Sequence, residues 1–118
     1  MADAGLFIGW GQVVRGREGP AVDGFNETVE FFGQLQGDGR IESFEICFLD
    51  PHGGDLDGFM LLRGSAEQMD AVRNNEEFQR HMTRANLHVE NLGLIGASLG
   101  EGIARQMAIF TEEIGALA

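Results

Sequence analysis

One imidazole and two carboxylates lie within a few residues of one another in the middle of the chain, at His52, Asp55 and Asp57. Such a set of nitrogen and oxygen atoms could bind a divalent metal, or His52 and Asp55 could act as base and orienter in proton transfer. The same segment contains Pro51 and a Gly-Gly pair, which a turn also requires. A solvated turn is the favoured interpretation and a functional loop the alternative. Because a second histidine or glutamate is missing, the sequence predicts no metal site.

Glu45 is a second candidate for chemistry. It lies in residues 41–49, where apolar residues alternate with polar or small ones as in a strand, and it projects opposite Phe44 and Phe48. If the phenylalanines pack on helices, Glu45 faces the other side of the sheet, where desolvation would raise its pKa and suit it to proton transfer. A structural ion pair, with Arg63 as a candidate, or exposure at a rim is the favoured alternative. The catalytic candidates are therefore Glu45, His52 and Asp55.

Trp10 and Gln12 are the main candidates for ligand binding. A tryptophan beside an amide can stack on and orient a flat molecule, and Phe59 could do the same. We expect Trp10 and Gln12 to look into the same space as Glu45, although such a tryptophan more often fills a dimer core. The predicted ligand-binding residues are Trp10, Gln12, Glu45 and Phe59.

Two further patterns give weaker evidence for a functional site. His81 and His88 could share a face only if one helix contained both, and the sequence predicts that the helix ends before His88, so satisfied or exposed histidines are favoured. The glycines of residues 93–102 match neither G-x-G-x-x-G nor a Gly-Lys-Ser/Thr phosphate loop, which excludes nucleotide binding. The sequence predicts no bound cofactor.

The composition of the chain limits which classes of partner we expect it to bind. The 118 residues carry a formal charge of −11, and all eight positive residues are arginines, which argues against nucleic acid or anionic membranes as partners. Cys47 is the only cysteine, so no intrachain disulfide is available, and a buried, inert thiol is favoured. The first residues lack a basic segment followed by an apolar one, and no apolar run approaches the roughly 18 residues needed to cross a bilayer. We expect a cytoplasmic protein.

The order of elements indicates the architecture. Capping boxes at Ser65/Gln68 and Ser98/Glu101 open two of the helices. The predicted elements are a strand at 6–14, a helix at 21–36, strands at 41–49 and 59–62, a helix from 65 to 85 broken at Asn74 and Asn75, a strand at 87–97 and a terminal helix. Helix is the alternative for the first few residues of 87–97. This β-α-β-β-α-β order is the split βαβ plan of ferredoxin-like α+β domains, with a four-stranded antiparallel sheet and helices on one face.

That plan leaves apolar groups on the second face of the sheet. Strand side chains alternate, so residues such as Ile8 and Leu61 cannot all point at the helices. Pairing two such sheets face to face would cover them, and a two-fold dimer is the commonest way to do so. The sequence therefore predicts a homodimer. The terminal helix has an apolar stripe that must also be buried against something.

Three segments carry a family resemblance: Gly39-Arg40-Ile41, Gly54-Asp55-Leu56-Asp57-Gly58-Phe59, and residues 65–78. In this order of elements, the chain resembles the dimeric α+β barrel superfamily, and within it small YCII-related and antibiotic-biosynthesis-monooxygenase-like domains. The resemblance covers about residues 6–97, which leaves residues 98–118 as an added C-terminal helix on a single domain spanning 1–118.

The resemblance implies a homodimer whose two sheets close around a cavity, in a group where some members oxidise, isomerise or bind small, often aromatic or polyketide-like molecules. The His and Asp pair associated with YCII-related domains has no clear counterpart, because no histidine precedes His52. No catalytic role is therefore carried over. The first hypothesis is a small homodimeric protein that binds a small organic molecule between or beside the sheets. The alternatives are a cofactor-independent oxygenase or isomerase, and a non-catalytic interaction module whose terminal helix docks on a partner.

Overall fold

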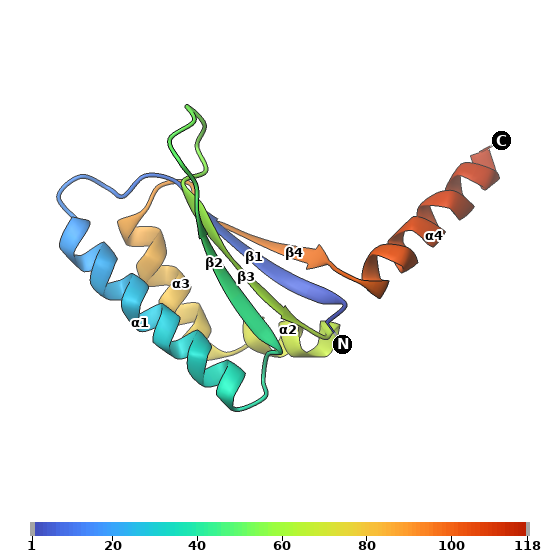
Figure 1. Ribbon diagram of the computed structural model, residues 1–118, viewed down its shortest axis with the longest axis horizontal. Helices are drawn as coiled ribbons and strands as arrows, with labels where there is room; N and C mark the ends of the chain where they lie inside the picture. The colour runs from blue at the N-terminus through green and yellow to red at the C-terminus, as the bar shows by residue number, and fades with distance from the viewer. Residues whose placement is uncertain (1, 118) are drawn as a thin grey trace.

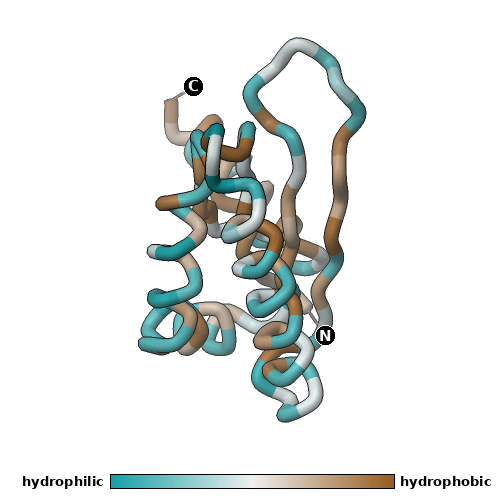
Figure 2. The backbone as a smooth tube through the Cα atoms, turned by 90° about the vertical axis from the view of Figure 1, so that its left-hand side faces the viewer, coloured by the Kyte–Doolittle hydropathy of each residue, from teal (hydrophilic) through white to brown (hydrophobic). Residues whose placement is uncertain are grey.

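The computed structural model describes residues 2–117 and contains a four-stranded antiparallel sheet with helices packed on one face (Figure 1). The elements follow the predicted order, with the helical stretch after the third strand divided in two. They are β1 (Ala4–Trp10), α1 (Glu18–Gly37), β2 (Ser43–Phe48), β3 (Gly58–Gly64), α2 (Ala66–Arg73), α3 (Glu76–His88), β4 (Gly93–Ser98) and α4 (Glu101–Leu117). The loop between β2 and β3, residues 49–57, extends beyond the sheet (Figure 2).

The sheet has the strand order β2-β3-β1-β4, and its register determines which side chains meet the helices. Leu6 pairs with Leu62 and Ile8 with Met60, and all four side chains are buried. They form one core with apolar side chains from the inner faces of α1, α2 and α3. The helical members of that core are Phe31, Phe32, Leu35, Met69, Val72 and Phe78.

The break between α2 and α3 comes from local capping, as the sequence predicted. The Ser65 side chain accepts a hydrogen bond from the Gln68 amide, while the Gln68 side chain accepts one from the Ser65 amide. Asn75 then caps α3 by accepting from the amide of Phe78 at 2.9 Å. These caps turn the chain so that both short helices present apolar residues to the same side of the sheet.

Several predicted boundaries were wrong. β4 begins at Gly93 rather than residue 87, and the alternative of helix for the first residues of that segment is confirmed, because α3 continues through His88 and the chain then turns at Asn91, which has φ 56°. β1 ends at Trp10 rather than residue 14, because β3 reaches only as far as Gly58, the partner of Trp10. Ser98 is the last residue of β4 rather than a helix cap, since α4 begins at Glu101.

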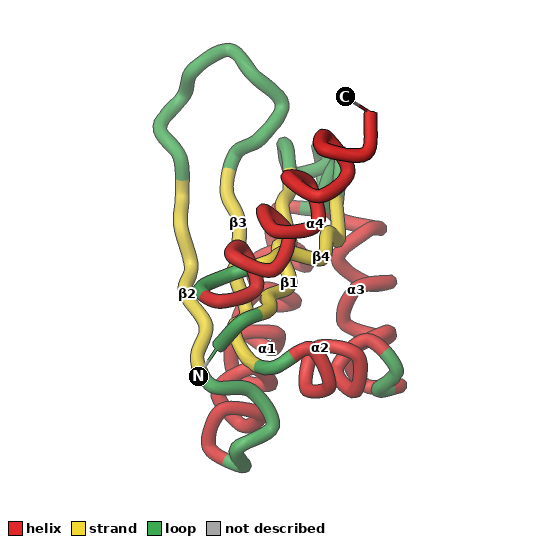
Figure 3. Tube along the Cα trace, turned by 90° about the vertical axis from the view of Figure 1, so that its right-hand side faces the viewer, coloured by secondary structure: helices red, strands yellow, loops and turns green. Residues whose placement is uncertain are grey.

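The second face of the sheet carries no helix from the described part of the chain. Phe7, Phe59 and Leu61 alternate with the buried core positions and point to this side, as does Ile95, which is 56% exposed. The prediction that apolar side chains leave both faces while helices cover one is confirmed. We call this side the open face; Figure 3 views the molecule from it.

The C-terminal helix α4 projects away from the rest of the domain (Figure 1). Six large apolar side chains on it are between 51% and 89% exposed, so the predicted stripe is not buried by this chain. They are Ile103, Met107, Ile109, Phe110, Ile114 and Leu117. Within residues 2–117, no helix combines the length and apolar character needed to cross a membrane.

Candidate functional site

An apolar pocket of about 480 Å³ lies between the start of α1, the end of α3 and one end of the sheet. Its walls come from five elements and the loops beside them, and the surface they present is almost entirely apolar. Prominent lining residues are Trp10, Phe25, Phe48, Met60, Met82 and Leu92. The volume falls in the range of about 300–1,000 Å³ that is typical of small-molecule sites.

Three aromatic rings form one wall of this pocket. Trp10 meets Phe25 and Phe48 edge-on, with ring centroids 6.1 and 6.2 Å apart and interplanar angles of 71° and 79°. Phe25 and Phe48 lie 5.7 Å apart. Edge-to-face pairs of this kind are favourable geometries for aromatic rings. Phe48 is nevertheless 69% exposed, so the cluster remains open on one side.

Trp10 is therefore on the helical side of the sheet, and its predicted position beside Glu45 was wrong. It has the same parity along β1 as the buried Leu6 and Ile8, whereas Glu45 pairs with Leu61 and faces the open side. Phe59 does share the open face with Glu45, where it stacks on Phe7 at 4.9 Å. The predicted ligand-binding residues are thus divided between opposite faces of the sheet.

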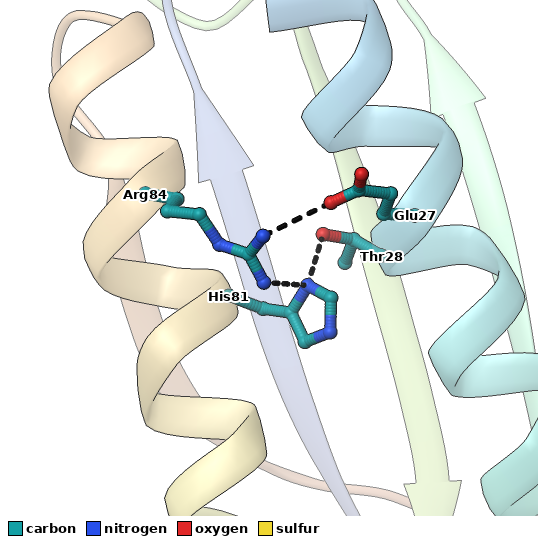
Figure 4. A network of polar contacts seen from close by, with 4 residues as sticks. All are labelled: Glu27, Thr28, His81 and Arg84. Atoms are coloured by element: carbon teal, nitrogen blue, oxygen red, sulfur yellow. Dashed lines mark hydrogen bonds and ion pairs between the residues drawn. The ribbon is translucent and has the colours of Figure 1, made fainter.

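A polar network occupies one corner of the pocket (Figure 4). The Nδ1 atom of His81 lies 3.1 Å from the Thr28 hydroxyl and 3.4 Å from an Arg84 nitrogen, and Arg84 also pairs with Glu27 at 3.0 Å. Because Arg84 can only donate, Nδ1 accepts, and neutral His81 carries its proton on Nε2. Burial, reinforced by the Arg84 charge, lowers the pKa of His81, so its neutral form prevails at pH 7.

His81 was predicted as a satisfied or exposed histidine. The structure shows a satisfied one: its side chain is 7% exposed and stacks on Phe31 with centroids 4.8 Å apart. The prediction that His81 and His88 do not share a helix was wrong, because α3 contains both. The Nδ1 atom of His88 is buried without a hydrogen-bond partner among the described residues. No local pattern in the sequence indicates the His81 site, since Thr28 comes from a helix 53 positions earlier.

Glu45 forms an ion pair with Arg63 across β2 and β3, as the favoured alternative predicted. The Glu45 oxygen and Arg63 nitrogen are 2.8 Å apart, with side chains 52% and 40% exposed. Both project from the open face, next to Ser43, which pairs with Arg63 in the register. This arrangement is a half-exposed ion pair on the open face, and Glu45 lies outside the apolar pocket.

The loop residues gather at a separate, polar cavity of about 370 Å³, which Gln12, His52, Asp55 and Glu90 help to line. His52 contacts the Asp50 carbonyl oxygen at 3.0 Å, and Gly53 has φ +81°, as a turn requires. No group of three His, Cys, Asp or Glu side chains between residues 2 and 117 is placed to hold a metal ion. Catalytic roles for His52 and Asp55 stay predictions. Gln12 lies here rather than beside Trp10.

These features define a ferredoxin-like α+β domain with an apolar pocket on its helical side, and solved structures share the fold. The chain is similar to a dimeric protein of unknown function and ferredoxin-like fold from Bacteroides fragilis, with a TM-score of 0.58 and 9% identity over 81% of this chain and 96% of that one. It is also similar to SnoaB, a cofactor-independent oxygenase from Streptomyces nogalater, with a TM-score of 0.53 and 16% identity over 84% and 95%. The predicted ferredoxin-like fold is confirmed.

No protein-family profile and no curated protein matches the sequence. The YCII-related resemblance therefore stays a prediction.

Proposed function

We propose that this protein is a homodimer that binds a small, largely apolar aromatic molecule in the pocket beside Trp10. The observation that carries the proposal is the aromatic wall of Trp10, Phe25 and Phe48, which surrounds open space of about 480 Å³. A protein core normally fills such space to the density of an organic crystal. A flat apolar ligand would restore the missing contacts and stack against the rings.

The polar corner indicates which ligands fit. Arg84 is the only cationic group that lines this pocket in the described chain, and Glu27 already offsets its charge at 3.0 Å. His81 is neutral, and Thr28 offers a hydroxyl. Such a corner can orient a neutral polar substituent, such as a hydroxyl or carbonyl, without requiring a charged ligand. The proposed class is therefore a neutral aromatic molecule with one hydrogen-bonding group.

The homodimer rests on the open face. Phe7, Phe59, Leu61 and Ile95 form a row of apolar side chains there, of which the first three are partly buried and Ile95 is 56% exposed to water. A second copy related by a two-fold axis would cover them with the same residues, leaving the two sheets about 10 Å apart. The described dimer from Bacteroides fragilis has the same fold and supports this part of the proposal.

Binding can be tested by fluorescence, because Trp10 is the only tryptophan and the chain contains no tyrosine. Titration with neutral aromatic compounds should change the Trp10 emission in a saturable way and raise the melting temperature. Ala85→Phe fills the pocket from α3 and should abolish both effects. Ala71→Phe, exposed on α2, is the matched control and should bind normally. The proposal fails if no compound binds, or if the two variants bind equally well.

A second candidate function is a cofactor-independent oxygenase acting on the bound molecule. The fold similarity to SnoaB favours it, as does a pocket whose apolar walls would hold a substrate away from water. The predicted catalytic residues Glu45, His52 and Asp55 do not line this pocket, so His81 is the titratable group to test first. Oxygen consumption in the presence of a bound phenol, if it is lost in the pocket-filling Ala85→Phe variant, would support the oxygenase function. Binding of the phenol without oxygen consumption would support ligand binding alone.

A further inference from the structure

Helix α4 has an apolar stripe that this chain does not cover. Ile103, Met107, Phe110, Ile114 and Leu117 follow one another at steps of four and three residues, which places them along one side of the helix. Each is more than half exposed. Most of the stability of helices in proteins comes from packing of their apolar side rather than from intrinsic propensity. The stripe therefore indicates a docking surface.

The base of α4 is held against the start of β1. An Arg105 nitrogen donates to the Asp3 carboxylate at 2.6 Å, and the Leu99 amide donates to the Asp3 carbonyl oxygen at 3.0 Å. Gly102 packs so closely on the Asp3 backbone that a Cβ would collide with that oxygen. These contacts fix the direction in which α4 leaves the domain, so it is an arm with a set orientation.

α4 leaves the domain on the side of the open face and projects outward from it. In Figure 1, α1 and α3 lie on one side of the sheet and α4 on the other, and Figure 3 shows α4 in front of the strands when viewed from the open face. The 17 residues of α4 rise about 25 Å. A second sheet packed on the open face would lie about 10 Å away. An arm of this length reaches past that sheet and along the helices behind it.

The position of α4 on the same side of the sheet as the open face favours a second copy of this chain as the occupant. The net charge of −11, and three glutamates against one arginine on α4, oppose docking on an anionic membrane or nucleic acid. A standard interface buries about 800 Å² on each partner, and the stripe would extend an interface formed by the open face. A two-fold axis would cover both surfaces on both copies at once.

We propose that α4 is an exchanged arm: in the homodimer, each α4 lies with its stripe along the flank of the other subunit, while the two open faces pack together. This inference rests on the homodimer of the proposed function and adds a second, separate surface to its interface. None of the buried core residues comes from α4, so the domain of each subunit folds independently of the arm.

The test compares two double variants that add the same charge to α4. Phe110→Glu with Ile114→Glu disrupts the stripe, whereas Ala108→Glu with Ala116→Glu changes the opposite side of the helix. Light scattering during size-exclusion chromatography should show wild type and the control at twice the chain mass. The stripe variant should dissociate at concentrations on the order of 100-fold higher than wild type. Unchanged dimerisation of the stripe variant, or equal weakening in the control, would overturn the arm.

Hydrogen exchange supplies a second readout in the intact chain. Leu61→Glu places a charge on the open face and should make the protein a monomer. The amides of α4 should be protected from exchange in the wild-type dimer and should lose that protection in Leu61→Glu, while the amides of α1 and α3 stay protected in both proteins. Equal protection of α4 in that monomer would also overturn the arm. If wild type is itself a monomer at micromolar concentration, both the arm and the homodimer fail. Ligand binding beside Trp10 is then still decided separately by fluorescence.

Discussion

Trp10 lies directly opposite Gly58 in the β1–β3 ladder, and the missing side chain at Gly58 leaves the space that the indole occupies. A Cβ built at Gly58 would come within 2.7 Å of an indole carbon and 2.8 Å of the Cys47 carbonyl oxygen. The second of these atoms belongs to the backbone of β2 and cannot move aside easily. The position of the aromatic wall thus depends on a glycine in the neighbouring strand.

Gly58→Ala should therefore displace Trp10 and loosen the end of β2. We expect a loss of about 1–3 kcal/mol in the free energy of unfolding, typical of overpacking, together with a shift in Trp10 emission. Urea denaturation followed by fluorescence measures both. Gly93→Ala is the matched control, since its nearest side-chain atom would be 4.0 Å away. A Gly58→Ala protein with wild-type stability and emission would contradict this account.

Stability should depend on pH through His81. Its pKa lies below the usual 6.5, because of burial and then the Arg84 charge, with opposing effects of Glu77 and Glu27. The unfolded chain therefore binds this proton at a higher pH than the folded chain does. The stability contributed by neutral His81 is complete above about pH 7 and is lost as the pH falls from about 6.5 through the folded-state pKa.

His81→Asn removes this titration while keeping an acceptor for the Thr28 hydroxyl. The free energy of unfolding of wild type should exceed that of the variant by more at about pH 7.5 than at about pH 5.5. Denaturant titrations at the two pH values measure the difference. Thr83→Ala, at an exposed position of the same helix that carries no titratable group, provides the control, and its difference from wild type should not change with pH. A wild-type advantage that grows towards low pH would show that the sign is wrong.

The Glu45–Arg63 pair should contribute little to the stability of the single domain. Both side chains are close to half exposed, and pairs of this kind are typically worth less than about 1 kcal/mol. Glu45→Gln should change the free energy of unfolding by no more than a few tenths of that amount and leave ligand-dependent Trp10 emission unaltered. Loss of ligand binding in this variant would indicate that the ligand binds on the open face rather than in the apolar pocket.

Local signals in the sequence predicted much of the fold. The Ser65 and Asn75 caps depend on side chains within three residues of the amides they meet, so their positions could be read directly. Strand alternation separated Phe44 from Glu45 correctly. The side of the sheet that Trp10 faces could not be assigned in the same way, because it depends on which face the helices cover.

The candidate site was harder to predict than the fold because it is assembled from distant segments. His81 meets Thr28 from another helix, and only the packing of α1 against α3 brings them together. The loop of His52 and Asp55 drew attention because its polar residues are adjacent in sequence, yet it extends beyond the sheet (Figure 2) and lines a separate, polar cavity. The residues of this loop are adjacent in sequence because they form a turn, whereas the residues of the apolar pocket come together only in the folded structure.

Phe48 separates binding from stability most clearly. Its ring belongs to the aromatic wall, but 69% of the residue is exposed, so the folded protein gains little from burying it. Phe48→Ala should lower the melting temperature by only a few degrees, equivalent to about 1 kcal/mol, while weakening binding of a neutral aromatic ligand about tenfold or more. Thermal unfolding and Trp10 fluorescence titration measure the two effects. Leu87→Ala, 55% exposed on α3 and outside the pocket, should leave affinity unchanged, so equal effects of the two substitutions on affinity would place the ligand elsewhere.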